Sequence, residues 1–326
     1  MFKRIMGVAS TMGILSYLYA KKVEQRSYRS FLIELGIRLV DTKRKYASDA
    51  LCEEQISREK DKTRRPYPGT RYAFRCNMTT QHIGDTTVYH INQRHDKSQR
   101  VIMYMHGGAW YQDPLTWHFE YIELLAERLD AHVIMPVYPK IPHADYRATF
   151  DMLTTLYAQV IETVADAQRV SLIGDSAGGQ IVLSFAQHVN VLGWAQPGHI
   201  VMLSPVLDAT YDNVAIPQYE SVDPMIGVPG AHYFSKLWAG DTPLEDYKVS
   251  PIYGEFEGLG HMTFVIGTKE ILYPDVVRLS ERLHQLDIAH DLIVGQHLYH
   301  VYPLMPIPER ETVLTQIVTI LSGEGA

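Results

Sequence analysis

A serine with small neighbours stands directly after a short apolar run. The run is Val170 to Ile173, and Gly174-Asp175-Ser176-Ala177-Gly178-Gly179 follows it with the pattern Gly-x-Ser-x-Gly. A helix-compatible stretch, Gln180 to Val189, comes next. A strand that turns at once into a helix exposes the residue at the turn, and only small neighbours fit beside it. This order predicts that Ser176 is a nucleophile at the carboxyl edge of a parallel sheet.

A second glycine cluster lies upstream. The segment His106-Gly107-Gly108-Ala109-Trp110 follows the apolar run Val101 to Met105. Backbone amides that no side chain obstructs can stabilise the oxyanion of a tetrahedral intermediate. We therefore expect Gly107, Gly108 and Ala177 to donate N–H groups to such an oxyanion. His106 is expected to fix its loop by a hydrogen bond, because the general base of this arrangement comes late in the chain.

These motifs resemble those of the hormone-sensitive-lipase branch of the α/β-hydrolases. The segment Tyr138 to His143 resembles the family's Tyr-x-Leu-x-Pro-Glu-x-Pro loop, and Ser250 to Leu272 resembles its stretch from Ser-Pro-Leu to Gly-x-x-Asp-x-Leu. The likeness covers residues 70 to 322. Three departures stand out: Ala109 in place of a third glycine, Glu270 in place of the usual aspartate, and a Tyr138 loop that keeps only its tyrosine and prolines.

What the resemblance implies is a serine carboxylesterase that hydrolyses short to medium acyl esters, with amino-terminal helices that cap the active site. Two alternatives stay open. The same catalytic groups could attack an amide or another activated carbonyl, and the same fold also hosts non-catalytic small-molecule receptors that keep the serine but lose the histidine. A histidine is retained here, so we expect an enzyme.

The acid and the base should follow the last two strands, in the chain order serine, acid, histidine. Glu270 comes just after the apolar run His261 to Ile266, and two histidines follow the run Asp291 to Val294. We expect a triad of Ser176, Glu270 and His300, because the residues after His300 resemble the family's His-x-aromatic ending. His297 is the alternative base. Asp275 is the alternative acid, although it could simply complement a helix dipole.

Apolar runs and helical stretches alternate along the chain, which indicates a mostly parallel, doubly wound sheet of about eight strands, the α/β-hydrolase fold. The closely spaced first two strands suggest that the sheet starts antiparallel. The expected strands are Tyr72 to Asn77, Thr87 to Asn92, Val101 to Met105, His132 to Val137, Val170 to Ile173, Ile200 to Leu203, Met262 to Ile266 and Asp291 to Val294. The expected helices are Tyr146 to Val164, Gln180 to Val189, Pro274 to Leu286 and Pro308 to Leu321.

The first sixty-odd residues differ from the rest, so we divide the chain into residues 1–66, a helical cap or a membrane-associating segment, and residues 67–326, the catalytic domain. An apolar run from Ile5 to Ala20 lies between Lys3-Arg4 and Lys21-Lys22. It has about sixteen residues, fewer than the roughly twenty that span a bilayer. Its basic flanks would suit anionic lipid headgroups, so residues 1–22 could contact a membrane surface. We expect a cap in a cytoplasmic enzyme, with membrane association as the alternative.

Composition limits the remaining classes of function. The chain has 326 residues, a hydrophobic content of 46% and a net charge of −7, which argues against nucleic-acid binding. Its two cysteines, Cys52 and Cys76, have no zinc-ligand spacing, so we expect no metal. We also expect no cofactor, and the resemblance implies a small-molecule ester as the partner. The substrate pocket is expected to include Trp110, Tyr138 and Trp238, with further apolar candidates in Trp117, Met225 and Tyr233.

Overall fold

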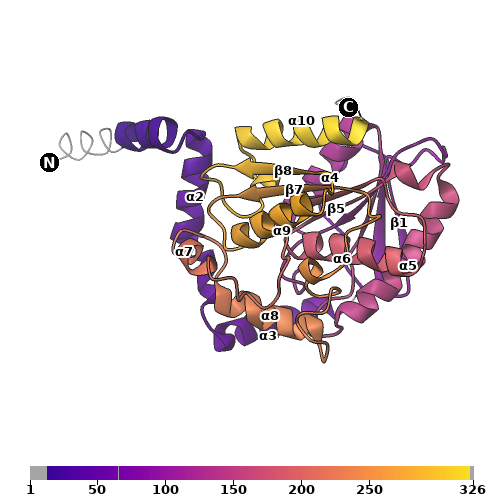
Figure 1. Cartoon of the computed structure of the whole chain (residues 1–326), viewed down its shortest axis with the longest axis horizontal. Coiled ribbons are helices and arrows are strands. Elements are labelled where there is room, and N and C mark those ends of the chain that lie inside the picture. The colour runs from indigo at the N-terminus through magenta and orange to yellow at the C-terminus, as the bar shows by residue number, and fades with distance from the viewer. Residues whose placement is uncertain (1–12, 65, 324–326) are drawn as a thin grey trace.

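The computed structural model describes residues 13–64 and 66–323 (Figure 1). Eight strands form one sheet in the order β1-β2-β4-β3-β5-β6-β7-β8. The six strands from β3 to β8 run parallel, whereas β2 pairs antiparallel with both β1 and β4. The expected fold and its antiparallel start are confirmed. The strands are β1 Met78–Ile83, β2 Thr86–Ile91, β3 Val101–Met105, β4 His132–Pro136, β5 Val170–Asp175, β6 His199–Leu203, β7 His261–Gly267 and β8 His290–Gly295.

Helices cover both faces of the sheet, and others lie over the carboxyl ends of its strands (Figure 1). The four predicted helices end within three residues of their observed bounds. The α-helices are α2 Tyr28–Val40, α3 Asp49–Thr63, α4 Thr116–Leu129, α5 Tyr146–Thr163, α6 Ala177–Val191, α7 Ile216–Glu220, α8 Val228–Ala239, α9 Tyr273–Gln285 and α10 Pro308–Ser322. Short helical turns are η1 Tyr19–Val23, η2 Thr42–Tyr46, η3 Ala167–Arg169, η4 Pro251–Tyr253 and η5 Tyr302–Leu304.

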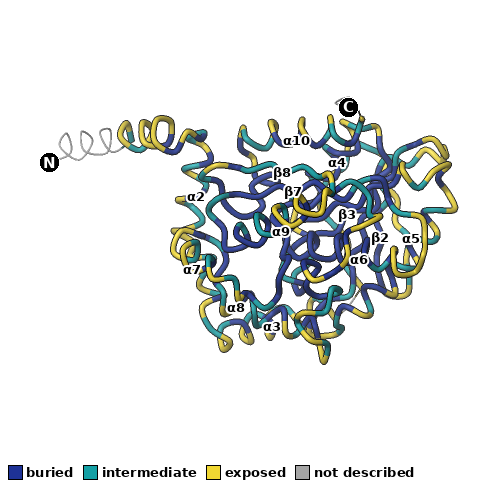
Figure 2. The backbone as a smooth tube through the Cα atoms, viewed as in Figure 1, coloured by how far each residue is buried: buried dark blue, intermediate teal, exposed yellow. Residues whose placement is uncertain are grey.

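Alternation along the strands builds two apolar layers. Met103 and Met105 of β3 pack with residues of α5, α6, α8 and α9 on one face. Ile102 and Tyr104 of the same strand pack with residues of α4 and α10 on the other face. Successive side chains of a strand point to opposite faces, so a strand that is covered on both sides is apolar throughout. Figure 2 shows the resulting buried centre.

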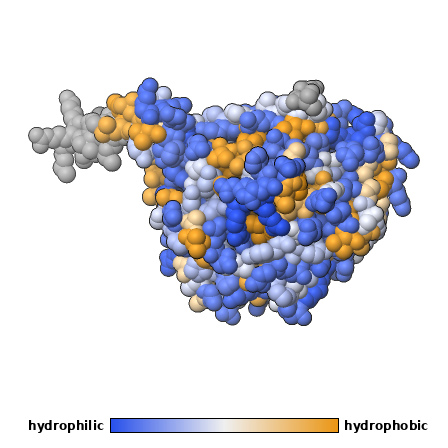
Figure 3. All heavy atoms as spheres, in the orientation of Figure 1, coloured by the Kyte–Doolittle hydropathy of each residue, from blue (hydrophilic) through white to orange (hydrophobic). Residues whose placement is uncertain are grey.

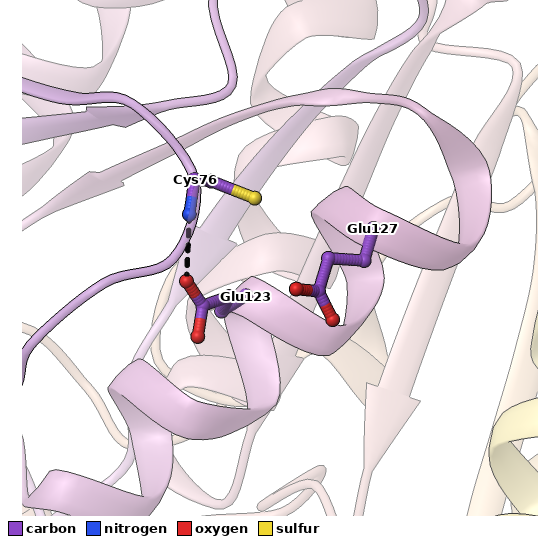
Figure 4. A group of neighbouring side chains, drawn as sticks. All are labelled: Cys76, Glu123 and Glu127. Atoms are coloured by element: carbon purple, nitrogen blue, oxygen red, sulfur yellow. Dashed lines mark hydrogen bonds between the residues drawn. The ribbon is translucent and has the colours of Figure 1, made fainter.

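The predicted strand Tyr72–Asn77 is wrong, because a carboxylate on α4 takes up its hydrogen bonds. Glu123 is fully buried, and its Oε1 accepts the backbone N–H groups of Arg75 and Cys76. Its Oε2 accepts the hydroxyl of Tyr72 at 2.7 Å. Figure 4 shows the Cys76 amide directed at Glu123. Amides that donate to a side chain cannot form a strand ladder, and the first strand therefore begins at Met78.

The same corner gathers a thiol and two carboxylates. Ligand atoms of Cys76, Glu123 and Glu127 lie within 4.8 Å of one another (Figure 4). Arg75 forms ion pairs with Glu123 at 3.2 Å and with Glu127 at 3.0 Å, so the two negative charges already have a cation beside them. We interpret this group as a clasp that fastens the segment before β1 to α4.

The amino-terminal helices pack against the catalytic part of the chain. The backbone N–H and hydroxyl of Ser27, the residue before α2, donate to Glu309 of α10 at 2.5 and 2.8 Å. The turn η2 lies so close to α8 that a Cβ at Gly230 would overlap Tyr46. None of the helices in residues 13–64 and 66–323 is long and apolar enough to cross a bilayer. Residues 1–12 of the apolar amino-terminal run lie outside the described residues.

Replacing Glu123 by alanine should lower the free energy of unfolding by about 2–3 kcal/mol, because it strands two amides and a hydroxyl without an acceptor. The expected reading is a fall of at least about 4 °C in melting temperature by scanning calorimetry. Glu127→Ala is the matched control: its partner Arg75 has an exposed side chain, and the loss should stay below about 1 kcal/mol. Equal losses in the two variants would contradict the clasp.

Candidate active site

Ser176 sits in a strained turn between β5 and α6. Its backbone has φ 53° and ψ −119°, a conformation that residues with a side chain adopt at a cost. A Cβ at Gly174 would overlap the Gly178 carbonyl, and a Cβ at Gly178 would overlap the Met105 carbonyl. These two positions therefore must be glycine, which accounts for the Gly-x-Ser-x-Gly pattern. The turn holds the Ser176 side chain at the carboxyl end of β5.

A chain of hydrogen bonds connects Ser176 to a histidine and a glutamate. The Nε2 atom of His300 lies 2.9 Å from Ser176 Oγ, and its Nδ1 lies 2.8 Å from Glu270 Oε2. The three residues follow β5, β7 and β8, whose carboxyl ends share one edge of the sheet. The carboxylate can only accept, so Nδ1 carries the proton and Nε2 is free to accept one from the serine. The structure thus brings the three predicted triad residues together.

Glu270 is held from its other side by a residue that sequence reasoning missed. Ser204, which follows β6, donates its hydroxyl to Glu270 Oε1 at 2.9 Å and accepts the Val301 N–H at 3.0 Å. The Gly267 N–H also donates to Oε1, at 2.6 Å. Ser204 therefore positions the glutamate and the loop that carries His300 at once. Its place just after a predicted strand at the same sheet edge was the available signal.

Buried acidic groups set the protonation of His300. Burial alone would lower the pKa of His300, but the hydrogen bond to Glu270 and the nearby charges of Asp223 and Asp175 raise it above the ordinary imidazole value. A raised pKa means that the surroundings stabilise the imidazolium form. The surroundings of His300 therefore favour a proton on its ring.

The oxyanion-donor prediction needs one correction. The Gly107 N–H donates to Asp175 Oδ1 at 3.0 Å, so its single hydrogen is already committed. In the described part of the chain no protein acceptor takes the N–H of Gly108, Ala109 or Ala177. Gly108 and Ala109 also line the cavity beside Ser176, whereas Gly107 does not. The available donors are therefore Gly108, Ala109 and Ala177.

His106 is placed to shape this loop, as expected from its early position in the chain. It is fully buried, and its Nδ1 lies 2.7 Å from the Gly107 carbonyl oxygen. Burial, with Lys140 and His118 nearby, holds the pKa of His106 well below its ordinary value, so the ring is neutral and donates from Nδ1. Tyr138 stacks on the ring with centroids 4.5 Å apart and donates its hydroxyl to the His106 carbonyl at 2.8 Å.

The two alternative triad residues make other contacts. Asp275 accepts from Asn213 at 2.8 Å and pairs with Arg278 at 3.1 Å. Burial raises the pKa of Asp275 to about 6. The backbone N–H of His297 donates to Thr268, and its side chain is bonded to neither Ser176 nor Glu270 in the described structure. The geometry therefore favours Glu270 and His300 over both.

A cavity of about 270 Å³ opens beside Ser176. The predicted pocket residues Trp110, Tyr138 and Trp238 do not line it. Both indoles are buried and donate to Gln180 Oε1, at 3.1 and 3.0 Å, because a buried indole N–H requires an acceptor. Of the further candidates, Trp117 and Met225 do line the cavity, together with Thr42, Lys45 and Tyr46 of η2 and Ile226.

One wall of the cavity is tied to the loop that carries the acid. Asp223, buried in the segment between α7 and α8, accepts the N–H groups of Met225 and Ile226 at 2.7 and 2.9 Å. Its other oxygen accepts the Ile271 N–H at 2.9 Å. Burial raises the pKa of Asp223 to about 6. The wall and the acid loop therefore share one carboxylate.

Comparisons with known proteins agree with this geometry. A family model described as alpha/beta hydrolase fold matches residues 102–304. An esterase from Acinetobacter venetianus is 25% identical over 190 residues, which are 58% of this chain and 63% of that protein. The chain thus spans just under two thirds of that relative. A Staphylococcus aureus protein assigned as an esterase superposes with a TM-score of 0.80 at 25% identity, covering 86% of this chain and 95% of the other.

A further structural neighbour has the same fold. A hormone-sensitive lipase from a metagenome library shares the fold with a TM-score of 0.76 at 20% identity. The match covers 90% of this chain and 98% of that one.

Glu270→Gln should lower the pKa of His300 below its wild-type value, because the neutral amide no longer stabilises the imidazolium. The measurement is a pH titration of the histidine ring resonances by NMR, with His300→Asn used to assign the signal. Asp275→Asn is the matched control and should leave the His300 titration where it is. A shift in the control and none in Glu270→Gln would move the acid to Asp275.

Proposed function

The chain belongs to the α/β-hydrolase fold family, and from this premise we propose that it is a serine carboxylesterase that works through an acyl-serine. The observation that carries the proposal is the continuous hydrogen-bonded chain from Ser176 Oγ through His300 to Glu270. Its position beside a cavity and a set of free amides is what ester hydrolysis requires. The esterases among its relatives support the same reaction class.

The chemistry starts with a proton transfer. A serine hydroxyl is a weak nucleophile, so His300 Nε2 takes its proton as Oγ attacks the ester carbonyl. Glu270 holds the imidazole by its Nδ1–H and stabilises the charge that the ring acquires. His300 then protonates the leaving alcohol, and water that loses its proton to the same nitrogen hydrolyses the acyl-serine.

The attack places negative charge on the carbonyl oxygen, and the proposed donors to it are the amides of Gly108, Ala109 and Ala177. Ala177 is the first residue of α6, where helix N–H groups have no partner within the helix. The positive end of the helix dipole adds to the effect. The hydrogen bond from the Gly107 N–H to Asp175 orients the loop and leaves the N–H groups of Gly108 and Ala109 free to donate to the oxyanion.

The size and lining of the cavity support esters of small acids. Its volume of about 270 Å³ is near the lower end of the roughly 300–1,000 Å³ that ligand pockets usually offer. Apolar side chains such as Leu115, Met225 and Ile226 form much of its wall. We therefore propose short to medium acyl chains, and we propose that residues up to 66 act as a cap, since η2 supplies three of the lining residues.

The same assay distinguishes two alternative functions. An amide hydrolase would use these groups on a poorer leaving group and would turn over anilides. A non-catalytic receptor would bind esters without hydrolysing them, and it would have no need for the bond between His300 and Ser176. That bond favours the enzyme.

With p-nitrophenyl esters from acetate to long acyl chains, we expect hydrolysis to be fastest for short chains and to fall by roughly 10⁴-fold or more in Ser176→Ala. The matched control is Ser184→Ala, which alters a buried serine of α6, the helix that follows Ser176, away from the cavity. Release of p-nitrophenol is followed at 400 nm. Turnover in Ser176→Ala equal to wild type would overturn the proposal, and turnover of anilides alone would favour the amidase.

The pH profile should show an acidic limb set by His300. The base works only when neutral, so kcat/KM falls as pH drops through the pKa of His300 in the free enzyme. That pKa is raised, which places the midpoint above the ordinary imidazole value of about 6.5. In Glu270→Gln the midpoint should move to lower pH while the rate at the plateau falls at least about a hundredfold. An unchanged midpoint would contradict the assignment.

A further inference from the structure

Apolar side chains are exposed mainly at the amino-terminal end of the described chain. Ten of the nineteen large apolar side chains that are exposed lie between Ile14 and Val40. The most exposed of these, Leu39 and Val40, are 78% and 76% accessible at the end of α2. Figure 3 shows apolar surface beside the grey atoms, on the helical part that precedes α2 and projects from the body in Figure 1. Such a concentration marks an interaction site.

Helix α2 is apolar on two sides. Ile33 and Ile37 point inward and pack against the core cluster below the helix. Leu32, Leu35 and Leu39 are spaced three and four residues apart and are all exposed, so they form a second stripe that faces outward. A helix with one partner needs only one apolar stripe. We call the outward stripe, together with the exposed Ile14, Leu15, Leu18 and Val23 of the helical residues 13–23, the amino-terminal face.

The exposed charges around this face are mostly positive. Between residues 13 and 45 the exposed basic side chains are Lys21, Lys22, Arg29, Arg38 and Arg44, and Asp41 is the one exposed acid of that range. The other two acids, Glu24 and Glu34, are buried. Arg26 and Lys269 neutralise them, at 2.5–3.0 Å. The whole chain carries −7, so the positive charge here is a local feature.

From this geometry we propose that the amino-terminal face docks on an anionic phospholipid surface. Exposed leucines flanked by lysine and arginine are suited to the boundary between acyl chains and acidic headgroups. The helix would lie in the plane of the interface, which agrees with the finding that no described helix could cross a bilayer. A second copy of this chain would bring the same positive charges together, and those charges would repel.

The docked face leads to the active-site cavity. Thr42 and Lys45 of η2 line that cavity, and Thr42 comes two residues after Val40. Arg38 donates to the Val222 carbonyl at 2.6 Å, and Thr42 donates to the Pro224 carbonyl at 3.3 Å, so α2 lies against the segment that supplies Met225 and Ile226. Docking through the amino-terminal face would place the cavity next to the lipid, and the substrate class that follows rests on the proposed function. Esters that partition into the bilayer are then the substrate class.

The face is fixed relative to the catalytic groups. Lys269, the residue before Glu270, donates to Glu24 at 2.6 Å and to Glu34 at 3.0 Å. Its side chain is 15% accessible, and those of the two glutamates are 6% and 7%. Water screens such buried pairs only weakly, so they hold α2 against the acid loop. Docking would therefore orient the cavity as well as recruit the enzyme.

The test is flotation of the full-length chain with vesicles, read by protein recovered with the lipid and with no substrate present. We expect binding to vesicles of phosphatidylcholine with 30% phosphatidylglycerol, weak binding to phosphatidylcholine alone, and release by 0.5 M salt. The double variant Leu35→Ser with Leu39→Ser should lower the partition coefficient at least about tenfold. Lys21→Glu with Lys22→Glu should remove the preference for the anionic vesicles.

The matched control alters two exposed apolar residues elsewhere, Val191 at the end of α6 and Leu286 just after α9, and the variant Val191→Ser with Leu286→Ser should bind like wild type. Hydrolysis of a water-soluble acetate ester should be unchanged in Leu35→Ser with Leu39→Ser, while hydrolysis of a vesicle-bound ester should fall with binding. Binding of the wild-type chain to vesicles without hydrolysis of either ester would contradict the proposed function but not the docking. Absence of binding to the vesicles, or equal binding by all variants, would overturn docking. Docking would also be overturned if wild type sediments as a dimer and Leu35→Ser with Leu39→Ser sediments as a monomer.

Discussion

The register of the parallel strands is the constraint on which the site depends. Asp175 pairs with Leu203, Leu203 with Val265 and Val265 with Ile293, so β5 to β8 end at nearly the same level. Ser176, Ser204, Glu270 and His300 come from the loops that begin there. A slip in any one pairing would move a reacting group by a whole residue spacing, about 3.3 Å, which is more than a hydrogen bond tolerates. The buried apolar strands therefore do more than stabilise the fold, since they set the distances within the triad.

Buried carboxylates beside the serine illustrate how the protein places negative charge in a dry region. Asp175 accepts from the Tyr104 hydroxyl at 2.7 Å and from the Gly107 amide, and Glu270 accepts from a hydroxyl, an amide and His300. Buried charges are tolerated when donors satisfy them. Here the donors are loop groups, so satisfying each charge also fixes a loop. The hydrogen bonds that offset the cost of burying these carboxylates also fix the loops of the proposed active site.

Sequence patterns predicted the site well where a motif constrains the backbone. The elbow requires glycines at 174 and 178, and alternating apolar runs revealed seven strands to within two residues. Predictions failed where a single side chain decides which backbone N–H groups are hydrogen-bonded. Glu123 removed the hydrogen bonds of the segment before β1, and Asp175 took the amide of Gly107. The three predicted aromatic pocket residues are core residues, since size and apolarity do not say which side of a loop a ring occupies. Helices α4 and α8 also escaped prediction.

One shared oxygen has a consequence for how a substrate reaches the serine. Gln180 Oε1 accepts the indoles of Trp110, from the loop after β3, and Trp238, from α8, while its amide nitrogen donates to Ser184 and to the Lys248 carbonyl. Helix α8 is thereby anchored to the helix that follows the nucleophile. To swing outward it would have to leave a buried indole without an acceptor. Met225 and Ile226, which line the cavity, come just before α8, so an anchored α8 limits how far this wall of the cavity can move. The width of the cavity would therefore limit which substrates reach Ser176.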